Sequence, residues 1–166
     1  GYPNYDEDES ILPPCGESNS TPNFIKFVNY VVANNGVNAE RFTVGTDSQF
    51  VLLGATRADY TDFRIFNHVG NGNGWNKNSS GNGYVRTSGA GSENGNSCGF
   101  HLQYGAFDFI TAGDLVSTAQ NYQALYVRDF IGQGKLEAFK SNHHMNTNSW
   151  GSGMQNYGFE PRAIVI

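Results

Sequence analysis

Half of the positions between Asn67 and Phe100 are glycine or asparagine: nine Gly and eight Asn fill 17 of these 34 residues. Such residues favour turns and offer little apolar surface to bury, so we expect a long surface loop or a pair of hairpins here. The Lys-Ser/Thr pair of a phosphate-binding loop is missing from the stretch. We therefore interpret residues 67–96 as a Gly/Asn-rich loop insertion within one domain that spans residues 1–166.

Outside this stretch, the apolar residues follow helical and strand-like periods in alternation. Thr21-Pro22 favours the start of a helix that closes at Asn35-Gly36, and a second helix is expected at about residues 117–130. Strand-like runs occupy residues 42–44, 50–53, 63–69, 98–110, 136–140 and 161–166, and the last run is expected to be buried. This order predicts an α/β fold with a mixed sheet and flanking helices.

The composition excludes several classes of protein. Charged residues make up 15% of the chain and the net charge is -5, which excludes a coiled coil and argues against a nucleic-acid binder that relies on clustered Lys and Arg. No apolar run is long enough to span a membrane, and no signal-peptide pattern opens the chain. Low charge with abundant Asn, Gly and Tyr favours a secreted or extracellular location. Cys15 and Cys98 form either one disulfide or two free thiols.

Polar residues follow two of the apolar strands. Asp114 comes directly after a strand that ends in Gly113, which places a carboxylate at the sheet edge where open α/β folds bind ligands. The alternative is that Asp114 caps the following helix. His143 and His144 follow a later strand and are either solvated loop residues or one metal ligand beside one proton donor or substrate contact. Imidazole and carboxylate together at one sheet edge suit zinc.

The two remaining histidines are expected to be structural. His101 lies within an alternating strand, and His68 ends a strand where a core or solvated position is favoured over metal binding. Neither has a partner at the spacing typical of metal ligands.

From residue 93 onward, the chain resembles the C-terminal part of metallo-β-lactamase-fold hydrolases. The nearest branch is the competence type, which includes the metallo-hydrolase domain of bacterial DNA-internalisation proteins and similar phosphorylcholine esterases. Four segments carry the resemblance: Asn-x-x-Ser within residues 93–100, a strand ending in Gly-Asp-Leu at 107–115, residues 136–149 with Lys-x-x-His-His, which resemble the family's Leu-Lys-x-x-His-His-Gly-Ser segment, and the strand at 161–166. Met145-Asn146 replaces the Gly-Ser of the family pattern.

This resemblance implies half of an αββα sandwich and a zinc-dependent hydrolase that acts on phosphoester-type bonds. Asp114 would bridge two zinc ions, and one of His143 and His144 would bind zinc while the other contacts the substrate or leaving group. A zinc-activated hydroxide would attack a small-molecule or cell-envelope substrate. The family's His-x-His-x-Asp-His motif is not in this sequence. Activity would therefore require an N-terminal half that carries this motif, as another fragment or another chain.

The competing hypothesis is a non-catalytic extracellular module for binding or self-assembly, built on a degenerate form of the same fold. In that case the Gly/Asn-rich stretch, with Trp75 and Tyr84, would contact glycans or other subunits.

Overall fold

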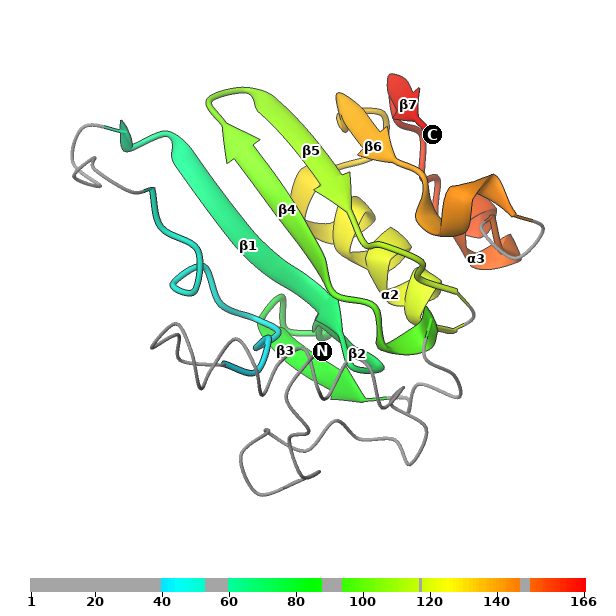
Figure 1. Cartoon of the computed structure of the whole chain (residues 1–166), viewed down its shortest axis with the longest axis horizontal. Helices are drawn as coiled ribbons and strands as arrows, with labels where there is room; N and C mark the ends of the chain where they lie inside the picture. The colour runs from blue at the N-terminus through cyan, green and yellow to red at the C-terminus, as the bar shows by residue number, and fades with distance from the viewer. Residues whose placement is uncertain (1–39, 53–59, 88–93, 117, 147–149) are drawn as a thin grey trace, which may run out of the picture. The chain divides into compact units, whose positions relative to one another are not determined.

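A computed structural model of the chain describes residues 40–52, 60–87, 94–116, 118–146 and 150–166 (Figure 1). The chain divides into two compact units, residues 1–41 and 42–166, and every element described below belongs to the second. The helix expected between residues 22 and 35 lies outside the described residues, as does Cys15, whereas Cys98 is an exposed free thiol. No helix in the described ranges is long and apolar enough to cross a membrane.

A seven-stranded sheet in the order β3-β2-β1-β4-β5-β6-β7 forms the second unit (Figure 1). The strands are β1 (Phe63–Gly70), β2 (Asn73–Lys77), β3 (Gly83–Thr87), β4 (Gly99–Tyr104), β5 (Phe107–Thr111), β6 (Ala138–Lys140) and β7 (Ala163–Val165). Neighbouring strands from β3 to β5 run antiparallel, whereas β5, β6 and β7 run parallel to one another. The sequence-based prediction of an α/β fold with a mixed sheet is confirmed.

Helical segments make the connections between the parallel strands. Helix α2 (Thr118–Tyr126) continues into the π-helical segment η3 (Val127–Ile131), and together they form the crossover that a parallel β5–β6 pair requires. Helix α3 (Ser152–Asn156) lies between β6 and β7. Two short 3₁₀ turns, η2 (Asn94–Asn96) and η4 (Asn142–Met145), precede β4 and follow β6 respectively.

A β-bulge in β1 directs two consecutive side chains towards α2. Asn67 pairs with Phe100 and Val69 pairs with Gly99, so His68 is the extra residue of the bulge. The His68 ring stacks on Tyr126 of α2, and Val69 belongs to a buried cluster with Ala119 of the same helix. The helix therefore covers one face of the sheet along β1.

The main core lies on this helix-covered face. Its buried members are Phe66, Ile110, Ala124, Tyr126, Val127, Leu136, Phe139, Met154 and Phe159. On the opposite face, Phe50 of the segment 42–52 contacts the ring of Phe100. That face has exposed aromatic residues at the end of the β4–β5 hairpin. Tyr104 and Phe107 lie opposite each other in this ladder, and their side chains are 56% and 45% exposed.

Two sequence-based predictions of secondary structure are wrong. Residues 42–44 and 50–52 are not strands. At Thr43, side chains take up the backbone groups that a ladder would use: Thr43 N–H donates to Gln49 Oε1, and Asn67 Nδ2 donates to Thr43 O. The last strand, β7, is exposed rather than buried, because it pairs only with β6 and ends the sheet.

The described part of the Gly/Asn-rich stretch up to residue 87 forms a pair of hairpins, β1–β2 and β2–β3. Of the two expected alternatives, the pair of hairpins is therefore confirmed there, and the long surface loop is wrong. The end of β1 and the hairpin β2–β3 account for most of residues 67–87, and the hairpin turn is held by Asn78 Oδ1, which accepts from the N–H groups of Ser80 and Asn82. The glycines here permit close packing. A Cβ atom at Gly74 would lie within 2.3 Å of Tyr122 on α2, and one at Gly83 within 2.3 Å of Trp75.

The approach of α2 to β2 depends on the missing side chain of Gly74. The Gly74→Ala substitution should therefore force the helix and hairpin apart and lower the free energy of unfolding by about 1–3 kcal/mol, measured by urea denaturation. Ser80→Ala, at an exposed site of the β2–β3 turn where the hydrogen bond to Asn78 uses the backbone N–H, is the control and should change it by less than about 0.5 kcal/mol. Equal effects of the two substitutions would contradict this packing account.

Candidate functional site

Asp114 lies in the turn that leads from β5 to α2. Gly113, directly before it, has a φ of 53°, in the left-handed region that favours glycine. Leu115 N–H donates to Ala112 O and closes the turn. Because α2 begins at Thr118, Asp114 stands four residues before the first helical residue. Asp114 is therefore not the N-cap of α2, which was the alternative that the sequence left open.

The His143-His144 pair lies in the turn after β6, and its backbone is strained. His143, His144 and Met145 have φ values of 45°, 52° and 57°. A non-glycine residue in this left-handed region costs about 1–2 kcal/mol. Three such residues in a row persist only where their surroundings hold them, and strained segments of this kind concentrate at functional sites.

The two turns meet at the edge of the sheet where β5 and β6 end. His143 N–H donates to Gly113 O at 3.1 Å, which joins the histidine turn directly to the aspartate turn. His144 Nε2 lies 3.4 Å from Asp114 Oδ1, and both side chains reach solvent. The structure thus brings Asp114 and His144 together, 30 residues apart in sequence.

His143 points to a different partner from His144, as expected for adjacent residues. Its Nε2 lies 3.3 Å from Asn94 Nδ2, and an amide nitrogen is only a donor, so this ring nitrogen accepts. Asn94 belongs to η2, within the segment 93–100. The same segment approaches the aspartate turn through Ser97, whose Cβ and Oγ would lie 3.6 Å from a Cβ at Gly113. Three distant segments therefore converge at this edge.

The geometry of Asp114 and His144 fits two ligands of one zinc ion. Bonds of about 2.0–2.2 Å at tetrahedral angles place two ligand atoms about 3.4 Å apart, which matches the observed 3.4 Å. The fit covers only part of a coordination sphere. Across the described segments, no group of three or more His, Cys, Asp or Glu side chains is arranged to hold a metal ion.

Sequence reasoning missed the polar side chains that support these turns. Asn94, Gln120, Gln123 and Asn142 were not singled out, although all four hydrogen-bond at or directly behind the site. Only Asn94 had a signal in the sequence, as the first residue of the Asn-x-x-Ser pattern. The glutamines of α2 carried none, because polar residues in a helix are usually exposed.

His68 and His101 lie in the core, away from this edge. His101 Nδ1 lies 2.9 Å from the hydroxyl of Tyr126, and its Nε2 lies 2.7 Å from Asp108 Oδ1. Neither ring nitrogen of His68 has a hydrogen-bond partner among the described residues. Burial lowers the pKa of both histidines, and in His101 the carboxylate of Asp108 partly offsets this. The structural role predicted for His101, and the core position favoured among those considered for His68, are confirmed.

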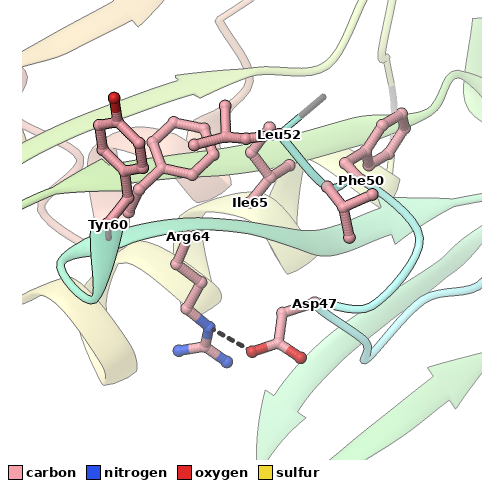
Figure 2. Close-up of a pocket in the computed structure, with 8 residues that line it drawn as sticks. Asp47, Phe50, Leu52, Tyr60, Arg64 and Ile65 are labelled. Carbon is pink, nitrogen blue, oxygen red and sulfur yellow. Dashed lines mark hydrogen bonds and ion pairs between the residues drawn. The ribbon is translucent and has the colours of Figure 1, made fainter. Parts of the chain in front are cut away.

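A separate pocket lies against the other face of the sheet (Figure 2). Its lining residues come from the segment before β1 and from β1 itself: Asp47, Phe50, Val51, Leu52, Tyr60, Phe63, Arg64 and Ile65. Figure 2 shows its two charged groups facing each other, with Arg64 Nε 3.0 Å from Asp47 Oδ2. Figure 2 shows the apolar side chains Tyr60, Leu52 and Phe50 on one side of β1 and the Asp47–Arg64 ion pair on the other. None of the predicted site residues lines this pocket.

Comparisons with models of known protein families, with curated proteins and with solved structures find no match to this chain.

The buried histidines make stability depend on pH. In the unfolded chain a histidine has its ordinary pKa of about 6.5, whereas burial lowers the pKa of His68 in the fold. Below about pH 6.5 the unfolded chain therefore binds more protons than the folded chain. The contribution of each buried histidine to the free energy of unfolding is fully present above that pH. It falls as the pH drops, by up to about 1.4 kcal/mol per pH unit. Replacing His68 by Phe should reduce the loss between about pH 7 and pH 5.5 by about 1 kcal/mol in urea denaturation.

The neighbouring core substitution Phe66→Leu is the control for this measurement. It removes packing but no titrating group, so it should lower stability by similar amounts at both pH values. A His68→Phe protein that loses as much stability as the wild type on acidification would show that His68 is not the group responsible.

Proposed function

We propose that this chain forms the C-terminal half of a zinc-dependent hydrolase with the metallo-β-lactamase fold, acting on phosphoester-type bonds. The observation that carries the proposal is the 3.4 Å approach of His144 Nε2 to Asp114 Oδ1, at the edge where two parallel strands end. The four segments that resemble this family are also the ones that meet or neighbour one another at this edge. Ser141 N–H, for example, donates to Val165 O and joins the histidine strand to the last strand.

The arrangement of layers supports half of an αββα sandwich. Helix α2 covers one face of the sheet. On the opposite face the segment 42–52 packs on part of the sheet, with Phe50 against Phe100, while Tyr104 and Phe107 at the end of the β4–β5 hairpin are exposed. A sheet in such a sandwich carries helices on one face and packs a second sheet on the other. An exposed aromatic face is what the inner side of a separated half would present.

Each site residue then has a distinct task. Asp114 supplies a carboxylate oxygen and His144 an imidazole nitrogen to the metal. By the resemblance, His143 would contact the substrate or leaving group. Its Nε2 accepts from Asn94 and its Nδ1 is buried, so exchanging a proton with a substrate would first require His143 to release Asn94. When bound, zinc lowers the pKa of a coordinated water and offsets negative charge that develops in the reaction. The four histidines of this sequence all lie in the described residues, so further ligands of the His-x-His-x-Asp-His kind would have to come from outside these 166 residues.

A second candidate function is a non-catalytic module for self-assembly. Its support is the exposed edge strand β7, where Ile164 and Val165 are 45% and 54% exposed. An apolar strand at an open edge is suited to pairing with another chain. This candidate predicts association that depends on protein concentration and does not require zinc.

Zinc titration of the 166-residue chain, followed through the imidazole signals in NMR spectra, tests the proposal. With two protein ligands the affinity should be low, but the His144 signals should shift while those of buried His68 do not. Asp114→Ala should weaken this binding about tenfold, because it removes one of two ligands.

The matched control is Asp62→Ala, which removes an exposed carboxylate from the turn before β1. It should leave the zinc titration unchanged. If His144 does not respond to zinc, or responds equally in the wild type and in Asp114→Ala, the metal-site proposal is wrong and the self-assembly module is favoured.

A further inference from the structure

Polar side chains are buried between α2 and the two turns of the site. Gln120, Gln123, Ser141 and Asn142 are each no more than 1% exposed. A buried amide is costly unless it is hydrogen-bonded, so apolar residues would ordinarily be favoured at such positions. These amides lie directly behind the candidate site, which raises the question of what they hold.

Gln120 joins the aspartate turn to the start of α3. Its Nε2 donates to Leu115 O at 2.8 Å, and Leu115 directly follows Asp114. Its Oε1 accepts from Gly151 N–H at 3.1 Å. One side chain thus fixes the backbone on the C-terminal side of Asp114 relative to the segment that follows the histidine turn.

Gln123 holds the histidine turn. Its Oε1 accepts from Asn142 Nδ2 at 2.7 Å, and Asn142 directly precedes His143. Gln120 and Gln123 are three residues apart on the helix, so they lie on the same face, one turn from each other. Helix α2 therefore presents one amide to each of the two turns that carry Asp114 and His144.

The strain of the histidine turn explains why such support is needed. His143, His144 and Met145 all have left-handed backbone conformations, which the sequence around them does not favour by itself. The backbones of the two turns are joined by the hydrogen bond from His143 N–H to Gly113 O. Buried amide contacts on both sides of this junction restrict the alternatives that the strained turn would otherwise adopt.

We infer that Gln120 and Gln123 are positioning residues, which hold Asp114 and His144 at the separation that a shared metal ion requires. This inference rests on the proposed function for the role of the metal. The hydrogen bonds by which Gln120 and Gln123 hold the two turns, however, belong to the chain alone, so their effect is measurable without metal.

Amide hydrogen exchange of the metal-free chain tests the positioning directly. Gln123→Met keeps the side-chain volume but removes the acceptor for Asn142. It should speed exchange of the His143 amide about tenfold, as expected from losing one hydrogen bond. Gln120→Met should do the same for the Gly151 amide, and it serves as the second variant if Gln123→Met does not fold. Amides in the middle of β4 should keep their relative order of exchange in both variants.

Zinc titration of the same proteins tests the link to the metal. Gln123→Met should weaken zinc binding at His144 about tenfold, and Gln123→Glu, which keeps an acceptor oxygen, should restore most of it. Val127→Ala is the matched control, since it removes packing from the core side of the same helical crossover and contacts neither turn through a hydrogen bond. It should lower global stability without changing the zinc affinity of the folded chain.

The outcomes separate the two proposals. If the His143 and Gly151 amides exchange at wild-type rates in both methionine variants, the positioning role is overturned. If the wild-type chain does not bind zinc at His144, the proposed function is wrong. Faster amide exchange in the methionine variants would in that case still show that Gln120 and Gln123 hold the two turns. Zinc binding that is equally strong in the wild type and in Gln123→Met overturns the assigned link to the metal.

Discussion

The parallel pairing of β5 with β6 is the constraint on which the candidate site depends. Parallel neighbours end at the same edge of a sheet, so the turns after Thr111 and Lys140 emerge side by side. The pairing in turn requires a crossover, and α2 with η3 provides it. The helix that makes the pairing possible therefore also lies directly behind the two turns and supplies the amides that hold them.

Strain and burial are balanced at this edge. The left-handed turn at His143, His144 and Met145 and the buried amides of Gln120 and Gln123 each cost stability when considered alone. The hydrogen bonds offset part of this cost, because both polar atoms of Gln120 and the Oε1 of Gln123 bond to groups that adjoin the site. The Nε2 of Gln123 remains buried without a hydrogen-bond partner among the described residues. A purely structural connection between β6 and α3 would need neither feature, which is why we interpret them as parts of one functional arrangement.

Local periodicity predicted much of the sheet and both turns. The run from Phe107 to Gly113 indicated a strand that ends in a carboxylate, and the structure places Asp114 after such a strand. Prediction failed where distant side chains decide the backbone. The segment around Thr43 has strand-like alternation, but Gln49 and Asn67 occupy its hydrogen-bonding groups. Gly74 resembled a loop residue, yet it serves the close packing of Tyr122.

The central claim is that Asp114 and His144 bind the same metal ion. Zinc-edge anomalous diffraction from crystals of this chain grown with zinc tests it most directly. We predict a peak about 2.0–2.2 Å from both Asp114 Oδ1 and His144 Nε2. Zinc peaks confined to other residues, or bound to His144 with Asp114 turned away, would contradict the claim.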